Sequence, residues 1–142
     1  MTRAVIQLQG YPLAETAPES VTGPRGKTLG TLTMESVAVG EVEIEDIRIT
    51  PQTLARQAEV ARAAGREALA ENFERAAEMT RLPEAEIMRI YELLRPGRAN
   101  SGAALSEAAE RLETKYAAPR LAAFIRQAAA QYDRRGLYRL RF

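Results

Sequence analysis

The sequence predicts a mostly helical protein, in which a small bundle of about five helices over residues 51–142 follows an extended N-terminal arm over residues 1–50. Three observations support this prediction. From residue 50 onward, apolar residues recur at the spacing of amphipathic helices. The first fifty residues hold five of the nine glycines and three of the seven prolines, which is typical of turns and extended chain. Beyond them, short segments with proline or glycine separate the helical stretches, and helices joined by short connections form bundles.

The N-terminal arm is predicted from turn signals followed by short apolar alternations. Proline and glycine mark turns at Tyr11-Pro12-Leu13 and at residues 22–26. One or two short helical turns are predicted within the arm, one of them starting at Thr33, and valine and isoleucine then alternate with other residues up to Ile49. Such a segment buries little surface against itself, so we expect it to lie along another surface.

The first two helices of the bundle are predicted over residues 51–64 and 66–81. Thr50 can accept a hydrogen bond from the free N–H groups of the first turn, and Pro51 suits the first helical position. Gly65 suits the end of the first helix. In the second helix, small and apolar residues form one stripe at helical spacing: Leu69, Phe73, Ala76, Ala77 and Thr80.

The last three helices are predicted over residues 84–94, residues 103–116 and from Pro119 to Gly136. A loop with proline and glycine, residues 95–102, separates the first of these from the second. A short basic tail follows Gly136. The stripes of these helices are Ile87, Ile90, Tyr91 and Leu94; Leu105, Ala108, Ala109, Leu112 and Tyr116; and Leu121, Phe124, Ile125, Ala128 and Tyr132.

The composition indicates one small domain with few large apolar side chains. Of the 142 residues, 46% are hydrophobic, but 26 are alanine and only 30 are leucine, isoleucine, valine or phenylalanine. The combined share of leucine, isoleucine, valine and phenylalanine is close to the roughly 20% below which chains tend to stay disordered. A core with so few large side chains is a physical reason to expect a partner surface.

The sequence also bears on the compartment. The absence of cysteine excludes a disulfide scaffold and is compatible with a reducing compartment. No apolar run approaches the roughly 18 residues of a membrane span, and the first ten residues lack the apolar region of a secretory signal. We therefore expect a soluble, cytoplasmic protein that does not contact a membrane.

Basic residues concentrate at the C-terminal end. Residues 115–142 carry seven lysines and arginines but only one acidic residue, Asp133, although the net charge of the whole chain is +1. Such a cluster can bind nucleic acid, so a stand-alone helical module that binds nucleic acid is the alternative function. It can equally be a solvated helix end, where cations suit the helix dipole. Binding to phosphates would weaken steeply with salt, so a gel shift tests the alternative.

The residue types that most catalytic sites need are missing. Without histidine and cysteine, the chain has no Ser-His-Asp triad, no imidazole base or ligand, no thiol nucleophile and no zinc knuckle. The glycine motifs that cradle phosphates are also absent. We therefore predict no catalytic, cofactor-binding or metal-binding residue on this chain.

Carboxylates and tyrosines are the remaining candidates. The carboxylates of Glu74 with Glu78, and of Glu43 with Glu45 and Asp46, could do acid–base work or bind a divalent ion. Because arginines are interleaved with them, we interpret them as surface ion pairs instead. The interleaved arginines are Arg48, Arg75 and Arg81. Three tyrosines fall on helix stripes and are interpreted as core or interface residues: Tyr91, Tyr116 and Tyr132.

A series of segments, in register from about residue 11 to residue 135, is similar to one protein family. The segments are Tyr11-Pro12-Leu13-Ala14, residues 46–54, Gly65-Arg66, Asn72-Phe73-Glu74-Arg75-Ala76-Ala77-Glu78, Ile90-Tyr91 with Leu94-Arg95-Pro96 and Arg98, Leu112-Glu113 with Tyr116, and Ala122-Ala123-Phe124-Ile125-Arg126 with Tyr132. The series resembles the small (gamma) subunit of adenosylcobalamin-dependent diol and glycerol dehydratases. The resemblance rests on the whole series, because no single segment is diagnostic.

This resemblance implies a non-catalytic subunit of a larger enzyme. In that family, a heterohexamer with two copies each of a large, a medium and a small subunit converts 1,2-propanediol, glycerol or ethanediol to an aldehyde by radical dehydration. Adenosylcobalamin lies between the large and medium subunits, and the substrate and a cation lie in the barrel of the large subunit. The small subunit packs against the large one and supplies no catalytic residue. We therefore expect this chain to bind the other subunits and not nucleic acid.

We expect three of the segments to contact the partner subunits: Tyr11, Pro12 and Leu13; Ile47, Arg48 and Ile49; and Asn72, Phe73 and Arg75. Many diol dehydratase small subunits carry a longer N-terminal extension, which is associated with packaging in bacterial microcompartments. Only ten residues precede Tyr11 here. The sequence therefore does not support such packaging.

Overall fold

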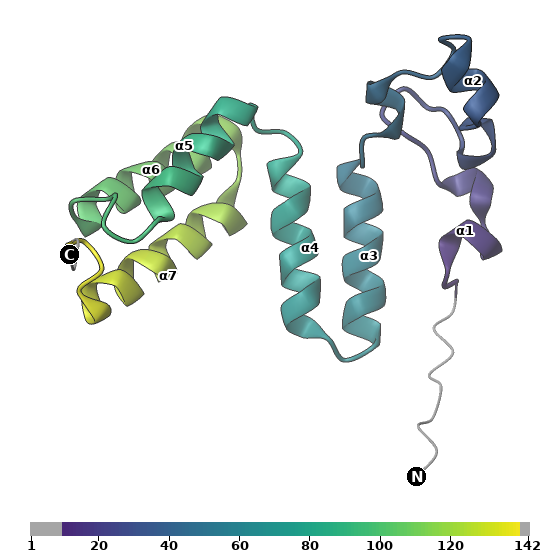
Figure 1. Cartoon of the computed structure of the whole chain (residues 1–142). Coiled ribbons are helices and arrows are strands. Elements are labelled where there is room, and N and C mark those ends of the chain that lie inside the picture. The colour runs from purple at the N-terminus through teal and green to yellow at the C-terminus, as the bar shows by residue number, and fades with distance from the viewer. Residues whose placement is uncertain (1–9, 140–142) are drawn as a thin grey trace. The chain divides into compact units, whose positions relative to one another are not determined.

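The computed structural model describes residues 10–139 and confirms that this part of the chain is mostly helical (Figure 1). It contains seven α-helices, three short 3-10 helices and no strand among those residues. The described residues divide into two compact units, the first ending at residue 77 and the second beginning at residue 78. The predicted division at residue 50 into an arm and a bundle stays a prediction. The first nine residues and the end of the predicted basic tail lie outside the described residues.

Five α-helices lie where the apolar periodicity predicts them, and their ends differ from the predicted bounds by no more than two residues. The second helix ends before residue 81 because the chain turns ahead of Pro83, which disfavours helical backbone at the residue before it. Over residues 10–139, none of the helices combines the length and the apolar character that a membrane crossing needs. The five are α3 (Pro51–Ala63), α4 (Glu67–Met79), α5 (Glu84–Leu94), α6 (Gly102–Tyr116) and α7 (Pro119–Arg135).

Residues 10–50 form short helical turns joined by loops. The Thr33 hydroxyl accepts a hydrogen bond from the N–H of Ser36, and Ser36 Oγ accepts one from the N–H of Thr33. This reciprocal capping starts a short helix. An antiparallel bridge between Thr22 and Thr28 closes the loop between them. The turns are α1 (Leu13–Thr16), η1 (Pro18–Ser20), η2 (Leu29–Thr31), α2 (Met34–Ala38) and η3 (Ile44–Ile47).

In the first unit, α3 and α4 lie side by side (Figure 1). Thr50 caps α3 by accepting a hydrogen bond from the N–H of Thr53 at 3.2 Å. Gly65 ends this helix with a φ of 72°, a left-handed conformation that costs glycine little. The two helices meet through small buried side chains, flanked by the half-buried Leu69 and Phe73: Ala58, Ala61 and Ala70.

In the second unit, α5, α6 and α7 enclose a larger core. Leu105, Leu112 and Ile125 are fully buried at its centre. Alanine loses no side-chain entropy on burial, and its small size lets two helix backbones approach closely. The buried alanines of α6 and of the segment leading into and along α7 are Ala108, Ala109, Ala118, Ala122 and Ala129.

The chain folds back after α7 and closes one end of this core. Gly136 ends the helix with a φ of 63°. The N–H of Gly97 then donates a hydrogen bond to the Leu137 carbonyl oxygen at 2.8 Å. The Tyr138 hydroxyl donates to the Ala129 carbonyl oxygen at 3.0 Å. These bonds fasten the loop after α5 to the segment that follows α7.

Candidate subunit interface

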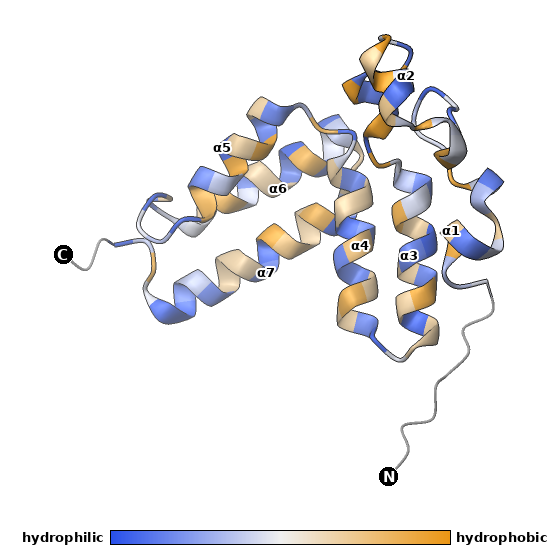
Figure 2. Ribbon diagram, turned by 45° about the vertical axis from the view of Figure 1, so that its right-hand side comes forward, coloured by the Kyte–Doolittle hydropathy of each residue, from blue (hydrophilic) through white to orange (hydrophobic). Residues whose placement is uncertain are grey.

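The first unit exposes many large apolar side chains between Met34 and Ile49. Each is at least 47% exposed, and Met34 is 80% exposed. Figure 2 shows several orange, hydrophobic segments around α2. Single exposed apolar residues are normal, whereas a contiguous apolar patch marks an interaction site, so this run of exposed residues is a candidate interface. We call this set the 34–49 surface: Met34, Val37, Val39, Ile44, Ile47 and Ile49.

A buried carboxylate anchors η3, which carries two of these residues. The oxygens of Asp46 accept hydrogen bonds from Arg25 Nε at 2.7 Å and Arg25 Nη2 at 2.8 Å. The N–H of Glu43 donates to the same carboxylate at 2.9 Å, and Lys27 Nζ lies 3.7 Å from it. The Glu43 N–H and the Arg25 guanidinium hold the pKa of Asp46 below its ordinary value. Asp46 therefore stays ionised and ties η3 to the loop between Thr22 and Thr28.

Gly23 makes this close approach possible. A Cβ at this position would lie 2.1 Å from the Asp46 carbonyl oxygen, far inside van der Waals contact. In a 3-10 helix, residues i and i+3 lie on the same face, so Ile44 and Ile47 share one side of η3 and Asp46 lies on another. The loop therefore holds the polar side of η3 and leaves the two isoleucines 62% and 58% exposed.

One predicted interface segment, residues 47–49, lies on the 34–49 surface. Ile47 and Ile49 belong to that surface, and the side chain of Arg48 is 68% exposed. Arg48 forms the expected surface pair with Glu45, at 3.6 Å, but the interpretation of Asp46 as a surface ion-pair residue is wrong, because Asp46 is buried. The main cationic partner of Glu43 and Asp46 is Arg25, which was not predicted from the sequence. Contact of residues 47–49 with a partner subunit stays a prediction.

The predicted segment at the start of the described chain is exposed in part. Tyr11 is exposed, whereas Pro12 and Leu13 are half-buried. The Pro12 carbonyl oxygen accepts hydrogen bonds from the N–H of Glu15 and the N–H of Thr16, which belong to α1. The tyrosine ring is therefore the accessible part of this segment, and its role in assembly stays a prediction.

The predicted segment on α4 has a mixed character. Asn72 is exposed and accepts a hydrogen bond from Arg75 Nη2 at 2.5 Å. Phe73, in contrast, packs against the buried alanines between α3 and α4. Glu74 forms the expected kind of ion pair, and one of its partners is Arg62 of α3, at 3.1 Å. Phe73 therefore contributes to the packing of the helix pair, and an interface role for this segment stays a prediction.

The interpretation of Glu78 as a surface ion-pair residue is wrong. Glu78 is buried, and its carboxylate accepts hydrogen bonds from the backbone N–H groups of Arg120 at 3.0 Å and Leu121 at 2.8 Å. These first-turn donors of α7 have no partner within the helix, and the helix dipole favours a negative charge beside them. Ala118, at the N-cap of α7, provides no side-chain cap.

Within the described residues, no group of three or more acidic side chains is placed to hold a metal ion.

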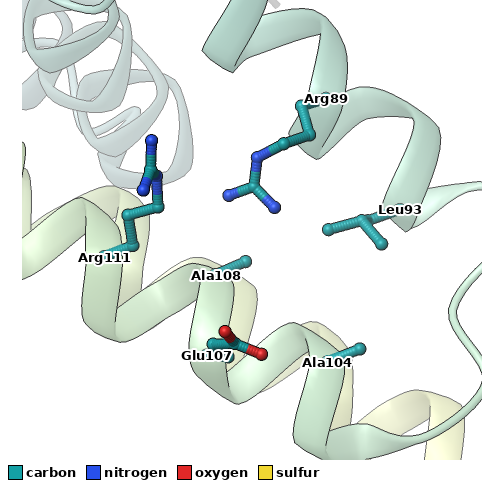
Figure 3. A pocket seen from close by; sticks show the side chains of 6 residues that line it. All are labelled: Arg89, Leu93, Ala104, Glu107, Ala108 and Arg111. Carbon is teal, nitrogen blue, oxygen red and sulfur yellow. The ribbon is translucent and has the colours of Figure 1, made fainter.

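A second buried carboxylate, Glu86, was not recognised from the sequence. Its Oε1 lies 2.8 Å from Arg89 Nη2 and 3.0 Å from Arg111 Nε. The Arg89 guanidinium, together with that of Arg111, holds the pKa of Glu86 below its ordinary value. Because Glu86 and Arg89 lie at helical spacing on one helix, their pairing could have been predicted from the sequence. The pairing with Arg111 could not, because Arg111 lies on another helix. Both arginines line a groove of about 460 Å³ between α5 and α6 (Figure 3).

The three tyrosines of the helix stripes differ in exposure. Tyr116 and Tyr132 pack against the core of the second unit, and the Tyr132 hydroxyl donates a hydrogen bond to the Leu94 carbonyl oxygen. Tyr91 is 58% exposed. The first two are therefore core residues, and Tyr91 is one of the apolar surface residues of the second unit.

The basic residues near the C-terminus have structural roles in the part of the chain that is described. Arg126 forms an ion pair with Glu113 at 2.6 Å. Arg134 and Arg135 lie in the last turn of α7, where the helix dipole favours cations. These positions agree with the interpretation of the basic cluster as a solvated helix end.

Comparison with known proteins identifies relatives over nearly the whole chain. Residues 6–139 match the model of the "Dehydratase small subunit" family. A propanediol dehydratase small subunit from Citrobacter freundii is 49% identical over 125 residues, which cover 88% of this chain and 72% of that protein. The propanediol dehydratase small subunit of Salmonella typhimurium strain LT2 is 46% identical over 129 residues, covering 91% of this chain and 74% of that protein. The chain therefore belongs to the dehydratase small subunit family.

Proposed function

We propose that this chain is the non-catalytic small subunit of a propanediol or glycerol dehydratase, in which it packs on the large catalytic subunit. The observation that carries the proposal is the 46–49% identity to two propanediol dehydratase small subunits over at least 88% of this chain. The complex would convert 1,2-diols or glycerol to aldehydes. It would contain two copies each of a large, a medium and this small subunit.

Adenosylcobalamin would supply the radical chemistry of this reaction. The residues of this chain do not fit the cofactor as a ligand set, because the sequence contains no histidine to provide an axial imidazole. The proposal therefore assigns the cofactor to the other subunits. This chain would contribute binding surface and shape to the assembly, and no group that touches the substrate.

The 34–49 surface supports an assembly role. Burying a large apolar side chain completely is worth about 1.5–3 kcal/mol, so covering one that is half exposed contributes about 1 kcal/mol. Six such side chains can supply several kcal/mol toward the cost of association. Because Asp46, Arg25 and Gly23 hold η3 in place, Ile44 and Ile47 would already be positioned when the partner binds. A preformed surface loses less conformational freedom on binding.

Co-expression with the large and medium subunits of a propanediol dehydratase tests the proposal. We expect the tagged small subunit to retain both other subunits, and the purified complex to dehydrate 1,2-propanediol when adenosylcobalamin is added. A chain that co-purifies with neither subunit would refute the proposal.

Two substitutions test the contribution of the 34–49 surface. Ile44→Ser with Ile47→Ser removes the apolar pair on η3, and should reduce the amount of complex that is recovered. Phe124→Ser is the control, because Phe124 is 41% exposed but lies on α7 in the other unit. Equal recovery from the double variant and the control would remove the 34–49 surface from the interface while leaving the proposed function intact.

A further inference from the structure

The groove between α5 and α6 has a polar end and an apolar end (Figure 3). The guanidinium groups of Arg89 and Arg111 lie toward one end, and the side chains of Leu93 and Ala104 lie toward the other. Ala108 lies between them on α6. At about 460 Å³, the groove has the size of sites that take a small ligand or a few side chains.

Two of the three accessible charged side chains in this groove are positive, and the buried carboxylate of Glu86 brings the four charges to a net of zero. Glu86 is ionised but buried, and both guanidinium groups already share it. The arginine side chains are nevertheless 44% and 45% exposed. Arg89 Nη1 donates no hydrogen bond to any residue that the structure describes. Glu107 lines the same groove and is exposed, so two accessible guanidinium groups face one accessible carboxylate.

Resting on the proposed function, we propose that this groove is a second contact with the dehydratase, and that it receives an acidic side chain of a partner subunit together with a neighbouring apolar side chain. The carboxylate would accept hydrogen bonds from Arg89 and Arg111, whose planar guanidinium groups suit carboxylate oxygens. The apolar side chain would cover Leu93 and Ala104. Glu86 holds both arginines in position before the partner arrives.

The affinity of the small subunit for the assembled large and medium subunits tests this inference. Arg111→Gln removes one guanidinium and leaves Glu86 paired with Arg89. Truncating one member of a desolvated charge pair at an interface typically weakens binding by about 30-fold or more, which is the loss we expect. Arg126→Gln is the matched control, because Arg126 pairs with a carboxylate on the surface of the same unit. It should change the affinity by less than about threefold.

Two further variants keep the inference testable if Arg111→Gln impairs folding. Ala104→Glu places a carboxylate at the apolar end without touching the arginines, and should weaken binding to a similar extent. Glu107→Gln reports the sign of the occupant's charge. It should tighten binding of an acidic side chain, whereas weaker binding would indicate a basic occupant and overturn the proposal.

The outcomes separate this inference from the proposed function. A wild-type chain that does not bind the other subunits refutes the proposed function and the inference with it. A wild-type chain that binds, while all three groove variants bind equally well, refutes the inference alone. Sedimentation of the isolated chain tests whether a second copy of the chain occupies the groove instead. A dimer that Arg111→Gln abolishes would assign the groove to self-association and overturn the proposal.

Discussion

Glu78→Ala should destabilise the second unit by about 3 kcal/mol, because it removes the carboxylate that caps α7. The backbone N–H groups of Arg120 and Leu121 lose their acceptor, and the Leu121 donor is buried. An unsatisfied buried donor costs about 1–3 kcal/mol, so about 1.5 kcal/mol for each of the two gives the total. This exceeds the roughly 1 kcal/mol that an ordinary helix cap contributes, since Ala118 offers no substitute.

Thermal unfolding followed by circular dichroism measures this loss. In a chain of this length, 1 kcal/mol shifts the midpoint by about 3–5 °C, so Glu78→Ala should unfold about 10–15 °C below the wild type. Glu71→Ala is the matched control, since Glu71 lies on the same helix, is exposed and is 3.8 Å from Arg75. It should unfold within about 2 °C of the wild type. Equal midpoints for the two variants, with unchanged amide exchange at Leu121, would show that Glu78 does not cap α7.

Two other predictions concern the anchor of η3. Gly23→Ala should destabilise the chain by about 2 kcal/mol or more, because its Cβ would overlap the Asp46 carbonyl oxygen; Gly30→Ala, whose Cβ would meet nothing within 4 Å, is the control, and equal melting of the two would contradict the close approach. The folded-state pKa of Asp46 lies below its ordinary value of 3.8, so its stabilising effect is present above that pH and is lost as the pH falls through the folded pKa. Asp46→Asn should therefore flatten the loss of stability in acid, and an unchanged acid profile would refute this.

The long helices could be predicted from the sequence because their signals are local. An apolar stripe depends only on residues three and four positions apart, and the ends are marked by residues such as Thr50 and Gly65 that act within one turn. The same locality explains why the pairing of Glu86 with Arg89 could have been read from the sequence. Each of these features is settled within a single helix.

The roles of Asp46 and Glu78 could not be interpreted from the sequence, because their partners are remote. Arg25 precedes Asp46 by 21 residues, and the first turn of α7 follows Glu78 by more than 40. Which charged groups meet over such distances depends on how the elements pack. The interleaved arginines were nearer in sequence but were not the principal partners. The exposure of apolar side chains is equally hard to predict from the sequence. The apolar alternation that includes Ile47 does not reveal whether other parts of the chain cover these residues.

Under the proposed function, the anchor of η3 also determines which part of the chain a peptide would need in order to bind the partner. A peptide that begins at residue 29 would keep every side chain of the 34–49 surface but would lose Gly23, Arg25 and Lys27. Asp46 would then be a carboxylate without its cations, which in a buried position either admits water or takes up a proton. Its turn would no longer be held in one orientation. Recognition by this subunit would thus depend on a loop that need not touch the partner at all.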